Sequence, residues 1–317
     1  MRLGGNLARA LLPALVLGIA FILLVLALAR LAQPTPAAIT AIEARPAELP
    51  ADLMRWHDDA PQDWKAYELP LKVCKIRCTT PYTAWRHRFN YDAASPRDPA
   101  VYFPFTNANF ALYLNGSLVE LHGRIEAPPS VFRFVGRVVR LPLPLLRAGE
   151  NELAWLLTIE RRGSGAVTPF FIGEYAAFEA PQRWLRWLTD DLVRASFWLQ
   201  LATLLFALAL IARGSREGVV LWFVLAAPFW LTLSLWHLTP EWIVATSLRF
   251  AAMYVSLFGV IAFSVLFVSA MLESPPRWLV RAALGYFAFG SALALTSEFW
   301  PELDGYWRIA LPHYTIK

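Results

Sequence analysis

The residues of this chain with the most distinctive chemistry are its only two cysteines, Cys74 and Cys78. Two thiols at this spacing can form a disulfide, share a metal ion or stay as free thiols. No second cysteine pair or histidine cluster lies near them in the sequence, so a metal site is poorly supported. In a straight strand their Cα atoms would be roughly 13 Å apart, beyond the ~7 Å limit for a bridge. A disulfide is the favoured prediction in an oxidising compartment, and it requires a turn within residues 75–77.

Acidic residues offer a second kind of chemistry, because two carboxyl groups held ~5–10 Å apart across a sugar can cleave a glycosidic bond. The candidates are Asp58, Asp59, Glu150 and Glu152. Their linear arrangement gives no sign of such a pair, and solvated turn residues explain them better. The sequence also lacks the motifs of a serine hydrolase, a zinc protease and a phosphate-binding loop. It therefore predicts no catalytic residue, no metal ligand and no cofactor.

Hydropathy separates the elements that must position these residues. One apolar stretch runs from Ala10 to Ala29, and four more follow between about Val193 and Thr296. Each is near or above the ~18 apolar residues typical of a membrane-spanning helix. The later four are expected at residues 195–212, 219–238, 246–272 and 279–297. A hydrophobic content of 57% fits a chain that is partly membrane and partly soluble.

Residues 1–33 hold the first apolar segment, which is either a transmembrane anchor or a cleaved signal sequence. Its apolar run is longer than the 7–15 residues usual in a signal peptide, which favours the anchor. The small residues of Ala27-Leu28-Ala29 nevertheless form a site that a signal peptidase could cut. Under either interpretation the residues that follow are exported.

The placement of basic residues predicts the orientation of these segments. The formal net charge is +5, and no dense Lys/Arg run is present, so a nucleic-acid partner is not expected. Arginines instead flank the apolar stretches, and such residues collect in cytoplasmic loops. We therefore expect residues 34–190 outside the cytoplasm and residues 298–317 as an extracytoplasmic tail. The arginines that support this orientation are Arg2, Arg9, Arg213, Arg216, Arg277 and Arg281.

The exported region is predicted to begin with a Pro- and Ala-rich tether at residues 34–63 and to continue as a β-domain at residues 64–181. The strongest local signal is the pair Asn115-Gly116 between two alternating runs, because this pair closes a tight two-residue hairpin. A second turn, residues 148–151, separates two more strands. Seven or eight short strands without a long helix favour an antiparallel β-sandwich or jelly roll. The predicted fold class is thus this domain between one transmembrane helix and an incomplete four-helix transmembrane bundle.

Several stretches of the β-domain resemble the galactose-binding-like jelly roll of the glycoside hydrolase family 2 sugar-binding domain. The resemblance covers roughly residues 64–180, and that type of domain also occurs as the exported region of bacterial membrane sensors. The matching stretches are Glu68-Leu69-Pro70, Trp85-Arg86-His87-Arg88-Phe89, Tyr113-Leu114-Asn115-Gly116 and Arg140-Leu-Pro-Leu-Pro-Leu-Leu-Arg147-Ala-Gly149-Glu150-Asn151-Glu-Leu.

A jelly roll of this type implies a sugar or other small-molecule ligand, bound by stacked aromatic rings and planar polar side chains. A structural role is the favoured interpretation of each candidate: Trp85 fills the core, Arg86 and Arg88 are solvated on the opposite face of its strand, and Asn115 shapes its turn. The candidates by residue type are Trp85, Arg86, Arg88, Asn115, His122 and Arg124.

The membrane part resembles seven-transmembrane receptors with diverse intracellular signalling modules, through its hydropathy and the stretch Glu217-Gly-Val-Val-Leu-Trp222-Phe223. In that family the output is usually a histidine kinase or a diguanylate cyclase. The resemblance implies a multi-pass protein of the bacterial inner membrane with a periplasmic sensor domain. Signalling proteins of this type commonly form homodimers.

Polar residues within apolar segments are costly in a membrane, so they are candidates for coupling the β-domain to the helices. Arg249 is expected either to extend to the interface or to pair with Glu241 or Glu298. His237 lies at the outer end of its segment and either titrates near neutral pH or caps the boundary. Residues 182–191 are predicted to form an amphipathic connector that lies at the outer headgroups, with one helical face made by Trp184, Leu185, Trp187 and Leu188.

These features predict the sensory part of a transmembrane signal-transduction receptor, such as one of a two-component system. With five crossings and a cytoplasmic start, the chain would end outside, where it cannot reach a cytoplasmic output domain. It is therefore expected to be the input half of a larger receptor. One alternative is a membrane-anchored carbohydrate-binding or polysaccharide-handling protein without signalling output. A membrane enzyme or transporter is a third interpretation, although the apolar segments lack the broken helices of a transporter.

Overall fold

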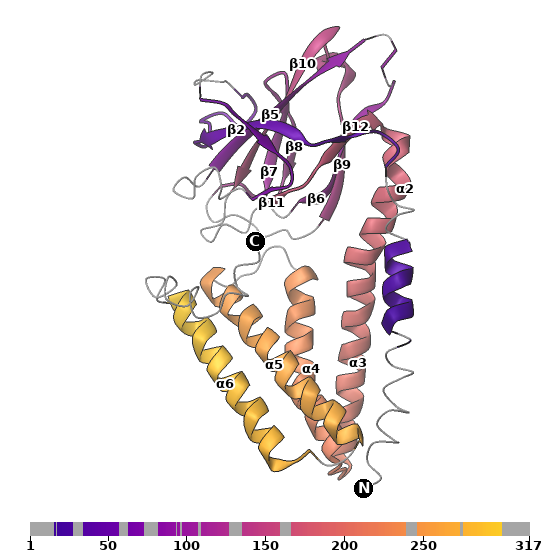
Figure 1. Cartoon of the computed structure of the whole chain (residues 1–317), viewed down its shortest axis with the longest axis vertical. Coiled ribbons are helices and arrows are strands. Elements are labelled where there is room, and N and C mark those ends of the chain that lie inside the picture. The colour runs from indigo at the N-terminus through magenta and orange to yellow at the C-terminus, as the bar shows by residue number, and fades with distance from the viewer. Residues whose placement is uncertain are drawn as a thin grey trace. The chain divides into compact units, whose positions relative to one another are not determined.

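The computed structural model describes residues 16, 18–27, 34–56, 63–72, 82–92, 94–95, 97–106, 109–126, 135–158, 166–238, 246–272 and 275–299. The chain divides into two compact units (Figure 1). One consists of residues 9–191 and contains all the strands, and the other consists mainly of residues 192–317 and contains helices. Cys74 and Cys78 lie outside the described residues, so their disulfide stays a prediction. The same holds for Asp58 and Asp59.

The β-rich unit contains two antiparallel sheets, each with six strands among the described residues. Sheet 1 has the order β1-β12-β6-β11-β4, and β9 also pairs with β6. Its strands are β1 (Ala38–Ile39), β12 (Phe170–Glu174), β6 (Pro99–Thr106), β11 (Ala166–Val167), β4 (Leu71–Lys72) and β9 (Val135–Arg140).

Sheet 2 has the order β3-β2-β5-β10-β7-β8. The two central strands pair along ten residues, which places Trp85 of β5 directly opposite Trp155 of β10. The strands of sheet 2 are β3 (Lys65–Glu68), β2 (Ala41–Ala47), β5 (Tyr82–Tyr91), β10 (Gly149–Thr158), β7 (Phe110–Leu114) and β8 (Ser117–His122).

The main hydrophobic core contains inward-facing residues of both sheets, which confirms the predicted β-sandwich. Trp85 and Trp155 of sheet 2 lie at its centre, with ring centroids 6.4 Å apart. From sheet 1, Phe103 and Phe170 both pack on Trp155. Because side chains alternate along a strand, every second residue of β5 and β10 enters this core, and the intervening residues lie on the outer face of sheet 2.

The hairpin turn between β7 and β8 has the predicted form. Asn115 and Gly116 have φ values of 50° and 84°, and Leu114 pairs with Ser117 across them. The turn is also fixed from outside, because the Asn115 amide donates to Leu145 O and to Asn151 Oδ1. Leu145 belongs to a short 3-10 helix, η2 (Leu143–Leu145), which precedes β10. The two turns singled out from the sequence are therefore hydrogen-bonded to each other.

The first part of the predicted tether differs from expectation, because residues 38–39 and 41–47 form β1 and β2. Strand β2 alternates: Ile42 and Ala44 enter the core, while Glu43 and Arg45 lie on the outer face of sheet 2. Pro46 is accommodated because its pairing is with β5, after the pairing with β3 has ended. A strand of this proline- and alanine-rich composition has little propensity signal, and its partners supply the stability.

Helix α2 (Tyr175–Arg186) begins seven residues before the predicted connector and belongs to the β-rich unit. Strand β12 ends at Glu174, directly before this helix. Phe178 stabilises the helix at this point, because its side chain, in the first turns of α2, is fully buried against Ala100 and Tyr102. A π-helical turn, η3 (Trp187–Asp191), follows, and the helix continues without interruption to Ala212.

The second unit contains four helices, each long and apolar enough to cross a membrane. They match the four predicted segments within three residues at each end. Successive helices pack on one another, α3 on α4, α4 on α5 and α5 on α6. In the first apolar stretch, residues 18–27 form an apolar helix and the remainder lies almost entirely outside the described residues. The four helices are α3 (Leu192–Ala212), α4 (Gly218–Leu238), α5 (Thr246–Leu272) and α6 (Arg277–Phe299).

Candidate functional site

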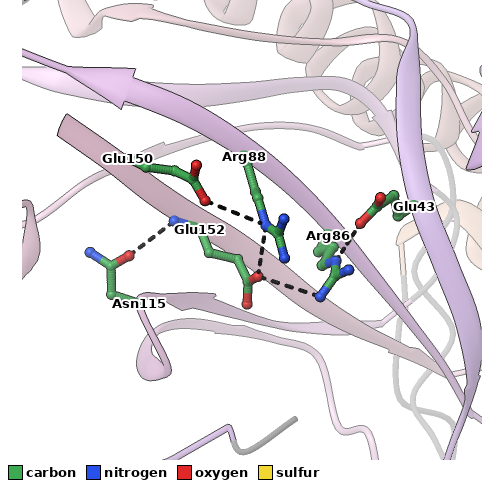
Figure 2. Close-up of polar contacts among 6 residues, drawn as sticks. All are labelled: Glu43, Arg86, Arg88, Asn115, Glu150 and Glu152. Carbon is green, nitrogen blue, oxygen red and sulfur yellow. Dashed lines mark hydrogen bonds and ion pairs between the residues drawn. The ribbon is translucent and has the colours of Figure 1, made fainter. Parts of the chain in front are cut away.

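The outer face of sheet 2 carries a row of alternating charges that we call the charge ladder, made of Glu43, Arg86, Arg88, Glu150 and Glu152 (Figure 2). The residues come from three neighbouring strands, β2, β5 and β10. Strand pairing places Glu43 opposite Arg86, and Arg88 opposite Glu152. Cross-strand neighbours of opposite charge attract each other, so the ladder follows from the register of the sheet.

Arg86 is the buried member of the ladder, with its side chain only 8% exposed. Its Nε donates to Glu43 Oε2, and its Nη1 lies 3.8 Å from Glu152 Oε2. A guanidinium group out of contact with water needs such partners, because an unpaired buried charge is very costly. Glu43 and Glu152 therefore hold Arg86 in place from the two strands that flank β5.

Arg88 is the open member of the ladder. Its side chain is half exposed, and its Nε lies 3.7 Å from Glu150 Oε1 and 3.6 Å from Glu152 Oε2. Glu150 is 69% exposed. This end of the ladder offers guanidinium donors and carboxylate acceptors to solvent, and exposed ion pairs of this kind contribute only about 0–1 kcal/mol to stability. Its polar groups are thus available to a ligand at little cost to the fold.

Aromatic side chains border the buried end of the ladder. The Arg86 guanidinium carbon lies 4.3 Å from the centre of the Trp64 ring, and Arg45 approaches the same ring at 5.2 Å. Arg45 also lies 5.6 Å from the centre of the Trp56 ring. Trp56 belongs to a small second cluster on this face, together with Tyr113 of β7. The outer face of sheet 2 therefore combines planar polar groups with aromatic rings.

Two carboxylates at the open end of the ladder pair with the same arginine. Glu150 and Glu152 both lie within 4 Å of the same nitrogen of Arg88. Among the described residues no group of His, Cys, Asp and Glu is placed to hold a metal ion.

Of the six residues predicted from the sequence to bind a ligand, the ladder brings together Arg86 and Arg88. Trp85 faces the core and has no exposed surface. Asn115 lies in its hairpin turn, where its Oδ1 accepts a hydrogen bond from the Glu152 backbone (Figure 2). Arg124 is exposed near the end of β8, and its carbonyl accepts a hydrogen bond from Asn109.

His122 is buried on the inner side of sheet 2, where its ring packs on Phe110 at 5.2 Å. Burial and the nearby Arg137 guanidinium lower the pKa of His122 to about 4, while Glu120 acts in the opposite direction. Arg137 of β9 is itself bonded to Glu120 of β8. His122 thus belongs to a polar contact between the two sheets and does not reach the ladder.

The four residues predicted to couple the domain to the membrane helices are only partly described. Arg249 is buried near the start of α5, and its guanidinium lies 4.5 Å from the centre of the Trp236 ring of α4. The predicted extension of Arg249 to the interface stays a prediction. Glu241 and the side chains of His237 and Glu298 lie outside the described residues, so the ion pairs of Arg249 stay a prediction.

Sequence reasoning missed Glu43 and Trp64 as parts of this face. Both lay in or beside the segment interpreted as a tether, and 43 residues separate Glu43 from Arg86. A usable signal was present in β2, where Ile42 and Ala44 alternate with Glu43 and Arg45. That period of two predicts a half-buried strand with its charges on one face.

No protein-family model matches this chain, and a search of curated proteins gives no match. Solved structures with some likeness include a glycosyl hydrolase family 2 member from Bacteroides cellulosilyticus, with 17% identity and a TM-score of 0.32 over 44% of this chain and 20% of that one. A β-glycosidase from Bacteroides vulgatus has 12% identity and a TM-score of 0.33 over 44% and 20%. A putative β-galactosidase from Bacteroides fragilis has 14% identity and a TM-score of 0.34 over 44% and 23%.

These three neighbours are a glycosyl hydrolase, a β-glycosidase and a putative β-galactosidase. The chain spans about a fifth of the length of each of them. A likeness at these TM-scores and identities does not assign a fold or an activity to the chain, so the β-sandwich is established by its own strand pairing and core.

Proposed function

We propose that this chain is the input region of a bacterial transmembrane receptor, whose β-sandwich detects an extracytoplasmic ligand. It would relay that signal to a cytoplasmic histidine kinase or diguanylate cyclase module, which is not among its 317 residues. The observation that carries the proposal is the unbroken helix Tyr175–Ala212. One face of its first turns is buried in the β-sandwich, and its last 21 residues are apolar enough to cross a membrane.

The ladder supports a small polar ligand, and a carbohydrate is the class we propose. Sugars are bound by planar polar side chains that pair with hydroxyl groups and by aromatic rings that stack on the sugar face. Arg88, Glu150 and Glu43 supply exposed donors and acceptors, and Trp64 lies beside Arg86 at the other end. A carbohydrate is neutral or weakly charged, which suits a ladder whose three carboxylates are already paired with its two guanidinium groups.

Topology is the first test of the proposal. Alkaline phosphatase, which is active only outside the cytoplasm, is fused after residues 92, 214 and 275. We expect activity for the first fusion and none for the other two, because residues 213–217 and 273–276 are the arginine-flanked loops. A cytoplasmic position for residue 92 would overturn the receptor interpretation.

Ligand binding is the second test. The full chain in lipid nanodiscs is screened against a panel of saccharides, and hydrogen exchange of α3–α6 is measured with the best binder. The Arg88→Ala variant should lose binding without unfolding, whereas Arg97→Ala, which removes an exposed arginine before β6, should bind normally. Changed exchange in the helices supports a receptor. Binding without any change in them favours the alternative, a membrane-anchored carbohydrate-binding protein.

A further inference from the structure

Helix α2 uses its apolar face within the β-rich unit. Phe178 and Pro181 are buried, and Leu185 lies against Gly136 of β9, where an added Cβ would be 2.5 Å from the Leu185 side chain. These three residues recur at helical spacing and therefore form one stripe. The predicted connector placed Leu185 on a face turned toward lipid headgroups, but this face is already occupied by the β-sandwich.

The outward side of the same helix end carries two tryptophans and two arginines, which we call the collar: Arg183, Trp184, Arg186 and Trp187. Trp184 and Trp187 are 40% and 43% exposed, and their rings meet edge to face at 5.8 Å. The two arginines are exposed in the same turn. Indole rings combine an apolar body with a polar N–H, so they favour the boundary between water and a bilayer.

The position of the collar along the helix matches the headgroup layer. Helix α3 has 21 residues, and at 1.5 Å per residue it is about 31 Å long, close to the ~30 Å thickness of a hydrocarbon core. The hydrocarbon boundary therefore falls near Leu192. Trp187 lies about 8 Å and Trp184 about 12 Å before that residue on the same unbroken helix. Each headgroup layer is roughly 5–8 Å thick, so Trp187 lies at its outer edge and Trp184 lies a few ångströms beyond it.

The charges around the collar are suited to phosphate. Residues 183–194 include three arginines and two aspartates, Asp190 and Asp191. Arg194 lies inside the start of α3 and is exposed, so its long side chain can extend back toward the headgroups. Arginine binds phosphate through paired N–H donors. The local excess of positive charge therefore faces the layer in which lipid phosphates lie.

We infer that the collar is a lipid-binding surface, which holds the α2 end of the β-sandwich at the phospholipid headgroups of the leaflet that α3 enters. The inference rests on the proposed membrane topology, but it goes beyond it. A sandwich on a free tether would move independently of the bilayer. A sandwich held by the collar has its α2 end anchored at the headgroups, directly before the residues of α3 in the sequence.

Collision accessibility of spin labels tests the collar in the full chain. Labels are attached to single cysteines, Ala180→Cys, Trp184→Cys, Trp187→Cys and Trp198→Cys, in a Cys74→Ser and Cys78→Ser background. The protein is held in nanodiscs of phosphatidylethanolamine and phosphatidylglycerol. Position 180 is exposed one turn above the collar, and Trp198 is exposed about 9 Å into α3. We expect a water-soluble nickel chelate to reach position 180 freely, 184 and 187 much less, and 198 least.

Equal nickel access at positions 180, 184 and 187, with oxygen access at 198, would overturn the collar and leave the proposed topology intact. Nickel access at position 198 would instead overturn the topology itself. If the cysteine-free background does not fold, tryptophan emission is measured with nitroxide-headgroup lipids in the chain with its native cysteines. The Trp184→Phe/Trp187→Phe variant should lose much of the quenchable emission, whereas the buried control Trp155→Phe should lose none. An equal loss in both would also contradict the collar.

Discussion

The β-sandwich and the helical unit use the same large apolar residues in opposite ways. In the sandwich, tryptophans such as Trp85 and Trp155 are completely or almost completely buried. In the helical unit, Trp198 and Trp230 are largely exposed, and only 6% of the apolar window of the first helix is buried. Removal of apolar surface from water stabilises the sandwich, whereas helices that are apolar on all sides require an apolar solvent.

The polar contacts differ in the same way. The sandwich contains asparagine and arginine–glutamate networks that join strands distant in sequence, such as Asn115 with Asn151 and Glu43 with Arg86. Contacts between the helices are mainly between aromatic rings, such as Phe229 with Phe263 and Phe287. The comparison shows that burial of an apolar side chain separates core residues from functional candidates only in the first unit. In the second, the helices are long and apolar enough to cross a membrane, so exposure of an apolar side chain does not by itself indicate a functional site.

The largest effect is expected from the sandwich core. Trp155→Ala removes a ring that contacts Trp85, Phe103 and Phe170, and it should reduce the free energy of unfolding of the sandwich by about 3–5 kcal/mol. The matched variant Trp198→Ala removes an equally large ring from the outside of α3 and should leave sandwich stability unchanged. Urea unfolding in detergent, followed by near-ultraviolet circular dichroism, measures both. An equal loss in the two variants would remove the distinction between the units.

A titration isolates a single buried group of the sandwich. Burial lowers the pKa of His122 to about 4 from 6.5, so the unfolded chain binds a proton that the folded chain does not. Stability from this residue is therefore present above pH 6.5 and is lost as the pH falls toward 4, by about 3 kcal/mol. Urea midpoints at pH 7 and pH 4 measure the loss, which should be smaller by that amount in His122→Gln. A variant with the same pH dependence as the parent chain would contradict the assignment.

Packing of the helices is tested by adding one methyl group. A Cβ at Gly259 of α5 would lie 2.5 Å from the Phe229 ring of α4, and a Cβ at Gly290 of α6 would lie closer still to the Phe258 ring of α5. Gly259→Ala should destabilise the helical unit by about 1–3 kcal/mol without affecting the sandwich. Gly285→Ala is the control, because nothing lies within 4 Å of its Cβ position. Thermal unfolding in micelles, monitored at 222 nm, should separate the two variants.

The sequence predicted the helices better than the strands, for a physical reason. A run of ~18 apolar residues is a local signal, and α3–α6 begin and end within three residues of the predicted segments. Strand β2 has no such signal, because proline and alanine lower its propensity and its stability comes from β3 and β5. The start of α2 was missed for a similar reason, since contact with Tyr102 decides the position of Phe178.

The site shows the same limit. Arg86 and Arg88 were identified by residue type. Glu43 reaches Arg86 only through strand pairing, and Trp64 reaches it only because the folded chain places its ring beside the Arg86 guanidinium group. For Trp85 the sequence favoured a core position over a ligand contact, and its place on the side of the strand that faces sheet 1 puts it in the core. Residue type predicts what a side chain is able to do, while the register of the sheet determines what it contacts.

The smallest effect concerns Asn115, for which the sequence indicated turn geometry and the structure adds hydrogen bonds. Asn115→Gly keeps a residue that accepts a positive φ, but it removes the amide that bonds Leu145 O, Asn151 Oδ1 and the Glu152 N–H. We expect a loss of about 1–2 kcal/mol, since the partners are only partly buried. Asn115→Ala removes the amide and also strains the turn, so it should cost about 1 kcal/mol more. Urea unfolding of both variants separates the two contributions, and a glycine variant as stable as the parent chain would mean that turn geometry alone explains this asparagine.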